Sequence, residues 1–119
     1  MKQEDKELLL KDLCSRLPYG VIIQIKDWAD LDAELKIGHI NRLQINDVEL
    51  KPYLFPMSSM TEEQKVIYGD LCYSIIQSLA KNMQSELNEL INWLNAHHFD
   101  YRGLIEKGLA IDATNLNVY

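Results

Sequence analysis

Hydrophobic residues follow two different periods along this chain. Between residues 21 and about 50, apolar and polar positions alternate, which is typical of β-strands with one buried face. Between residues 61 and 97, apolar positions recur at helical spacing and no proline interrupts them. The change of period predicts one α+β domain over residues 1–119, with an N-terminal helix, a three- or four-stranded antiparallel meander and a helical C-terminal half packed on the sheet.

The first predicted helix covers residues 4 to 17. Leu10, Leu13 and Cys14 recur at three- and four-residue spacing, which gives the helix one apolar face. Pro18 ends the helix, because the residue before a proline is disfavoured in the α region. A first strand with one buried face is predicted to follow over residues 21–26.

A second strand is predicted around residues 34–40, after a turn at 27–30. Leu35, Ile37 and His39 would share one face of this strand. The alternation slips after Ile40, which predicts a bulge or turn near Asn41. A third strand is expected at 43–45 and a short fourth one at 48–50, after a turn at 46–47.

The segment 51–57 is apolar but carries prolines near both ends. Proline has no N–H for a sheet ladder, so we expect an edge strand or an ordered connector rather than a central strand. A helix start follows, because Thr61 with Gln64, or Ser59 with Glu62, has the spacing of a capping box.

One helical pattern runs from residue 62 to residue 97. As a single helix it would be ~54 Å long, more than the width of a domain of this size. We therefore expect it to bend, around residues 81–82, or to project in part and pair with another copy of the chain. Asp100 is predicted to cap a further short helix that ends at Gly108, and residues 112–119 are predicted to form a loose tail.

These elements define a predicted core shared by the sheet and the helices. It contains Leu13, Val21, Ile23, Ile25, Leu35, Ile37, Ile76, Leu79, Leu90 and Leu94. Cys14 and Cys72 lie on apolar stripes, so we expect two reduced, buried cysteines rather than a disulfide.

The overall charge limits the classes of partner. The formal net charge is −6, and the lysines and arginines are scattered, which argues against direct binding to nucleic acid. The acidic N-terminus does not have the form of a signal peptide, and no apolar run is long enough to span a membrane. We expect a cytoplasmic protein whose partner is another protein.

Histidines provide the only cluster of metal-ligand residue types. His97 and His98 are adjacent, with His39 as a more distant candidate ligand. Adjacent residues on a helix point about 100° apart, so a helix end with one exposed and one half-buried histidine is the favoured interpretation. No nucleophile, phosphate-binding or dinucleotide motif is present, so we expect no enzyme activity, no metal and no cofactor.

The segment 52–60 is the candidate partner-binding surface. Its large apolar side chains lie close together, and such residues are enriched in protein interfaces: Tyr53, Leu54, Phe55, Met57 and Met60. The alternative, which we favour, is that this segment crosses the open end of the sheet and closes the core.

Three stretches carry a resemblance to a known family. They are residues 11–21, residues 51–64 (KPYLFPMSSMTEEQ) and residues 93–110 (WLNAHHFDYRGLIEKGLA). Together they resemble a family of small uncharacterised proteins of gut anaerobic bacteria and their phages. The resemblance implies a cytoplasmic accessory protein of bacterial or phage origin. It carries over no activity and no functional residue, and it allows residues 66–90 to be two elements with a loop between them.

Three functions remain open on the sequence. The first is a non-enzymatic protein-interaction or accessory module. The second is a metal-dependent enzyme or metal-binding protein that uses His97 and His98. The third is an acidic modulator of a nucleic-acid-binding protein. A homodimer through the long helix is compatible with each of them.

Overall fold

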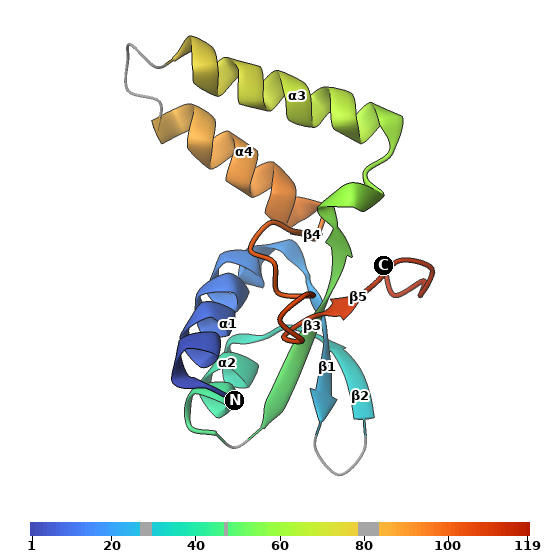
Figure 1. Cartoon of the computed structure of the whole chain (residues 1–119). Coiled ribbons are helices and arrows are strands. Elements are labelled where there is room, and N and C mark those ends of the chain that lie inside the picture. Colours follow the sequence, from blue (N-terminus) through green and yellow to red (C-terminus); the bar gives the residue numbers. More distant parts are fainter. Residues whose placement is uncertain (27–29, 47, 79–83) are drawn as a thin grey trace.

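The computed structural model describes residues 1–26, 30–46, 48–78 and 84–119 (Figure 1). Within these ranges the chain forms four α-helices and a mixed five-stranded sheet, so the predicted α+β class is confirmed. The elements in chain order are α1 (Gln3–Arg16), η1 (Leu17–Tyr19), β1 (Ile22–Lys26), β2 (Asp30–Glu34), α2 (Ile37–Gln44), β3 (Glu49–Pro56), η2 (Met57–Ser59), α3 (Glu62–Gln77), α4 (Gln84–Ala96), β4 (Phe99–Asp100) and β5 (Ile111–Asp112).

The sheet has the order β2-β1-β3-β4, with β5 also paired to β3. Strand β1 is antiparallel to both β2 and β3, whereas β4 and β5 are parallel to β3. The predicted antiparallel meander is therefore wrong in its order, because β1 lies between β2 and β3, and the C-terminal part of the chain adds two short parallel strands.

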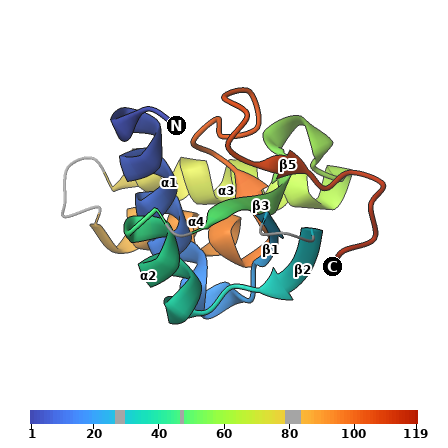
Figure 2. The ribbon, with the colours of Figure 1, turned by 90° about the horizontal axis from the view of Figure 1, so that it is seen from below.

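Helices α1 and α2 pack on the sheet and form its main core (Figure 2). The predicted first helix is confirmed, with Leu9 and Leu13 fully buried on its inner face. The alternation predicted for β1 is also confirmed, because Val21, Ile23 and Ile25 are all buried in this core. Residues 27–29 of the predicted turn lie outside the described residues.

The prediction of strands between residues 35 and 45 is wrong. Residues 37–44 form helix α2, in which Ile40 and Leu43 are three residues apart and share the buried face. The Lys36 N–H donates to His39 Nδ1 at 2.9 Å, which satisfies a backbone donor at the start of this helix. The apparent slip in the alternation was therefore helical spacing, and Ile37, predicted to be core, is 66% exposed.

Segment 51–57 does not form an edge strand. Strand β3 lies inside the sheet, with β1 on one side and β4 and β5 on the other. Its two halves use different partners: residues 49–52 pair with β1, and residues 53–56 pair with β5 and β4. Pro52 is tolerated because this part of the strand pairs on one side only.

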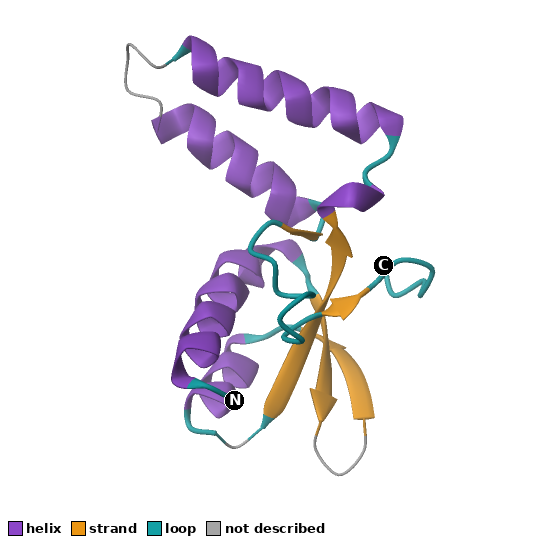
Figure 3. Cartoon of the chain, viewed as in Figure 1, coloured by secondary structure: helices purple, strands orange, loops and turns teal. Residues whose placement is uncertain are grey.

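The long helical pattern forms two helices that lie side by side as a hairpin (Figures 1 and 3). Thr61 and Gln64 form the predicted capping box at the start of α3, with hydrogen bonds of 2.9 and 3.2 Å. The bend expected at residues 81–82 lies outside the described residues.

The hairpin extends beyond the end of the sheet instead of covering its face (Figure 3). The radius of gyration is 15.4 Å, against about 13–14 Å for a compact domain of this length. A second core joins the hairpin to the sheet, with Met60, Leu94 and Phe99 buried at its centre and Tyr68 and Leu90 packed against them. The prediction that the C-terminal half packs on the sheet is thus wrong for α3 and for most of α4.

The C-terminal region differs from both predictions made for it. No helix follows Asp100; instead its carboxylate accepts hydrogen bonds from the N–H groups of Leu104 and Ile105 and holds a turn. Gly108 has the positive φ expected of a C′ glycine, at 73°, but it follows a turn rather than a helix.

The end of the chain is not a loose tail. Strand β5 pairs with β3, and Ala113 is buried. The Tyr119 hydroxyl accepts from the Ile22 N–H at 2.9 Å and donates to the Tyr53 carbonyl at 2.7 Å. These bonds fix the last residue to two strands of the sheet, which the polar composition of residues 112–119 does not reveal.

Three further core predictions need correction. Cys14 is exposed and Cys72 only partly buried, although both are free thiols as predicted. Ile76 is 59% exposed on α3, and Leu90 is partly buried. Leu79 lies outside the described residues.

Candidate functional site

The segment 52–60 lies largely inside the protein. Tyr53, Leu54 and Met60 are buried, and Phe55 and Met57 are partly buried against the second core. Phe55 packs edge-on against Phe99, with 6.5 Å between ring centroids. The structure therefore agrees with the interpretation that this segment closes the core, and it leaves little of it for a partner.

The three histidines occupy separate environments. His39 lies in α2, where it caps the helix, and burial lowers its pKa. His97 is exposed and its ring packs against Trp93 at an angle of 47°, with 4.8 Å between ring centroids. His98 is half-buried and stacks on Tyr119, with 3.8 Å between centroids. Within the described ranges, no group of three or more His, Cys, Asp or Glu side chains could hold a metal ion.

A pocket of about 350 Å³ lies beside the second core, next to His97 and His98. Phe55 of β3, Ser59 of η2 and Gln64 of α3 also line it. Its lining includes no carboxylate, which a histidine would need as a partner for acid–base chemistry of the usual kind. The pocket thus brings two of the predicted site residues together without supplying a recognisable reaction centre.

His98 should make folding stability depend on pH. Burial, helped by the nearby positive charge of Arg16 and by His97, lowers the pKa of His98 to about 4. The unfolded histidine has a pKa of about 6.5, so between these values the unfolded chain binds a proton that the folded chain does not. Stability from this group is present above about pH 6.5 and is lost as the pH falls toward 4.

The matched variant is His98→Asn, which does not titrate and tolerates the positive φ of 62° at this position. Urea unfolding at pH 7.5 and 4.5 should show a smaller acid-induced loss for the variant, by about 1–2 kcal/mol after allowing for the solvent-exposed part of the ring. Equal losses in both proteins would contradict a neutral, buried His98.

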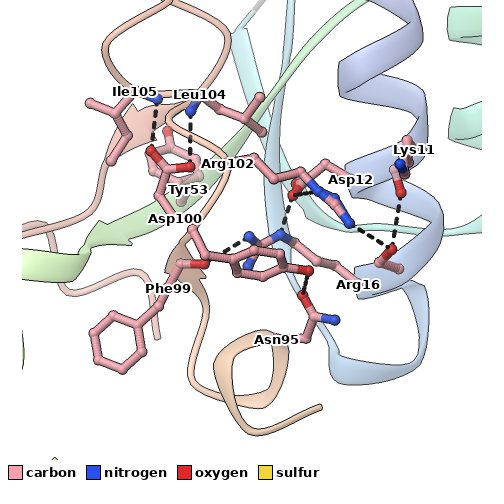
Figure 4. A network of polar contacts seen from close by, with 12 residues as sticks. Lys11, Asp12, Arg16, Tyr53, Asn95, Phe99, Asp100, Arg102, Leu104 and Ile105 are labelled. Atoms are coloured by element: carbon pink, nitrogen blue, oxygen red, sulfur yellow. Dashed lines mark hydrogen bonds and ion pairs between the residues drawn. The ribbon is translucent and has the colours of Figure 1, made fainter. Parts of the chain in front are cut away.

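A buried polar network joins α1 to the segment 95–102 (Figure 4). Arg16 and Asp12 are fully buried and form an ion pair, with 2.7 Å between Nε and Oδ2. Arg16 Nη2 donates to the Phe99 carbonyl at 2.7 Å, and Arg102 Nε lies 3.7 Å from Asp12 Oδ1. The Tyr101 ring contacts both guanidinium groups, at 5.2 and 4.9 Å from its centroid.

This network fits a structural role. Charged side chains are rarely fully buried unless they are paired, and here Asp12 pairs with both Arg16 and Arg102. Within the described residues, one atom of each of these side chains still has no hydrogen-bond partner. Neither Arg16 nor Arg102 lines any of five pockets found on the described part of the chain. The arrangement fixes the N-terminal helix to the C-terminal segment rather than presenting charge to a ligand.

The clearest candidate for a working surface is the outer face of α3. Among its described residues α3 buries none fully, and its side toward α4 is covered only in part. Val66, Tyr73 and Ile76 are 63%, 62% and 59% exposed. With Gly69 they follow a three-four-three spacing, which places the four residues in one row along the helix. We call this row the α3 stripe.

The α3 stripe lies on the side of the helix away from α4. The partly buried residues Tyr68, Leu71 and Ile75 recur at three- and four-residue spacing and mark the α4-facing side, roughly opposite the stripe at 100° per residue. No large apolar residue in the described part of α4 is exposed in this way. The hairpin therefore has one apolar outer face, and it belongs to α3.

No contact among the described residues requires a glycine at position 69, in the middle of the stripe. A glycine inside a helix costs about 0.5–1 kcal/mol relative to alanine. A Cβ at this position would meet no atom of the described residues within 4 Å, so no packing within the molecule requires its absence. A position without a side chain on an exposed apolar face allows another helix to approach closely.

The sequence contains the signal for this stripe, but a stronger pattern masked it. Reading residues 62–97 as one helix joins Tyr68 and Cys72 to Ile76 in a single row. The structure instead places Ile76 with Val66 and Tyr73, because the helix ends at Gln77 and pairs with α4 through Tyr68, Leu71 and Ile75. A search for two separate apolar rows within residues 62–77 would have found the α3 stripe.

Comparisons with protein-family models, with curated proteins and with solved structures gave no match to this chain. The family resemblance noted in the sequence therefore stays a prediction. Within the described residues, no helix combines the length and the apolar character that crossing a membrane requires.

Proposed function

We propose that this protein is a non-enzymatic protein-interaction module and that the α3 stripe is its contact surface. The observation that supports the proposal is the row of Val66, Gly69, Tyr73 and Ile76 on the outside of a projecting hairpin. Contiguous exposed apolar residues usually mark a protein-binding face. The partner would be another protein that supplies a complementary apolar helix or groove.

The anchoring of the hairpin supports this role. Tyr68 and Leu90 tie the two helices into the second core, where Trp93 stacks on Phe99 with 5.7 Å between centroids. A face held on such a rigid support loses little entropy on binding. Burying a Val, Ile or Tyr side chain contributes roughly 1.5–3 kcal/mol, so three of them favour a moderate rather than a very tight complex.

The test is capture of a partner with matched baits. Immobilised wild-type protein is incubated with an extract of its native host, and bound proteins are quantified by mass spectrometry beside two variants. Tyr73→Glu places a charge in the stripe and should abolish capture of any specific partner. Ile67→Glu is the control, because Ile67 is also an exposed apolar residue of α3, at 43%, but lies outside the stripe.

The proposal is supported by a protein, identified by mass, that is retained in stoichiometric amount by the wild type and by Ile67→Glu and is lost with Tyr73→Glu. A second copy of the chain counts as such a protein. Equal capture by all three baits would refute the stripe as the contact surface. Circular dichroism melts of the three proteins should coincide, because both substituted residues are exposed.

A further inference from the structure

We propose that the partner of the α3 stripe is a second copy of this chain, and that two α3 helices pair antiparallel across a two-fold axis that passes between Gly69 and Tyr73. This inference rests on the proposed function, since it identifies the protein that the stripe binds. Most soluble oligomers are symmetric homodimers, and a two-fold interface requires a surface that is complementary to itself.

The order of side chains along the stripe has that property. Reversing the helix about the midpoint of the stripe sets Val66 against Ile76 of the second copy, and Gly69 against its Tyr73. Each large aromatic ring then meets a position without a side chain, where a Cβ would touch no atom of the described residues of its own chain. This pairing of large with small residues gives Gly69 the role that nothing within the monomer provides.

The residues beside the stripe affect the strength of this pairing. Lys65 and Cys72 border one side, and Asp70 and Gln77 border the other. The two-fold axis lies at the level of residue 71 and sets each border against the same border of the second copy, so Asp70 and Cys72 each lie nearest to their own counterpart. The two exposed Asp70 carboxylates therefore form a like-charge pair at the edge of the interface, which weakens the dimer most at low ionic strength.

The size of the face sets the expected strength of the dimer. The stripe runs over 10 residue steps from Val66 to Ile76, or roughly 15 Å of helix, which is short for a stable interface. Two hairpins joined in this way form a small four-helix arrangement. We therefore expect a dimer whose formation depends on protein concentration in the micromolar range.

The first experiment is sedimentation equilibrium of the full chain from about 1 µM to about 500 µM. Wild type and Ile67→Glu should change from monomer mass to dimer mass over this range. Tyr73→Glu should associate at least about tenfold more weakly, because its charge would be buried between the two α3 helices. A thermal melt that matches wild type shows that the variant is folded.

The second experiment tests the orientation of the helices. With Cys14→Ser and Cys72→Ser as the background, Val66→Cys chains and Ile76→Cys chains are oxidised separately and as a mixture. In the antiparallel pair only the mixture brings two thiols close enough for a disulfide. Cross-linking of Val66→Cys chains alone would overturn the antiparallel arrangement.

Wild-type protein that stays monomeric up to about 500 µM overturns this inference. The proposed function fails separately, if the capture experiment finds no protein whose binding depends on Tyr73. If the protein is a monomer and captures a different protein through Tyr73, the proposed dimer is refuted and the proposed interaction function still stands. If Ile67→Glu weakens the dimer as much as Tyr73→Glu does, the proposed contact between the two α3 helices is also refuted.

Discussion

Replacing Asp12 with alanine is expected to lower the free energy of unfolding by about 3–5 kcal/mol. Arg16 would remain fully buried with no carboxylate beside its Nε. Its Nη2 would keep the Phe99 carbonyl, but a neutral acceptor does not neutralise a guanidinium. Arg102 would lose the same partner. Urea denaturation followed by circular dichroism measures the effect.

The control is the double variant Asp12→Leu with Arg16→Met, which replaces both charged side chains of the ion pair with apolar ones. It should be more stable than Asp12→Ala, because replacing a buried ion pair with apolar residues is often close to neutral. The Phe99 carbonyl then loses its donor, so some loss remains. A loss below about 1 kcal/mol for Asp12→Ala would show that the pair is not buried in solution.

Leu54→Ala is expected to cost about 2–5 kcal/mol, because it would open a cavity in the main core. Leu54 is fully buried at the point where β3 changes partner, and its carbonyl accepts from the Ala113 N–H at 2.8 Å. The backbone bonds would survive the substitution, so the loss reports packing alone. Thermal and urea unfolding of the variant measure it.

The matched control is Leu31→Ala on the edge strand β2, where the same side chain is 59% exposed. It should change stability by no more than about 0.5 kcal/mol. Similar losses for the two leucines would contradict the placement of the segment 52–60 in the core. The result also bears on the idea that this segment binds a partner, since a variant that unfolds cannot report on binding.

Local signals account for the parts of the fold that the sequence predicted well. Helix α1 is amphipathic and ends at Pro18, and the strand β1 alternates cleanly with Ile23 buried. The capping box of Thr61 and Gln64 is formed by neighbours three residues apart. Each of these features is decided within a few residues, so periodicity and end signals suffice.

Distant contacts account for the parts that the sequence did not predict. Strand β3 is a central strand only because β4 and β5 arrive from more than 40 residues away. Helix α2 was hidden because Leu35 and Ile37 imitate alternation, whereas Ile40 and Leu43 carry the helical spacing. Tyr119 is fixed by bonds to Ile22 and Tyr53, which no local pattern announces.

The candidate site was also partly accessible from sequence. Expecting a long helix that pairs with another copy placed attention on the region of the proposed α3 stripe, but not on Val66 or Tyr73. Asp12 and Arg16 stand four residues apart, a spacing that also occurs on solvent-exposed helix faces. Only the contacts with Phe99 and Arg102, which are distant in sequence, show that this pair is buried.

The connection between β3 and β4 has a consequence for how the chain folds. The hairpin of α3 and α4 is inserted between two strands that pair with each other, and it relies mainly on contacts between near neighbours in sequence. Such elements form quickly, whereas distant pairings form slowly. The sheet takes up β5, Leu104 and Leu109 only after the hairpin has been synthesised. We therefore expect the exposed hairpin to form early and the main core to close last.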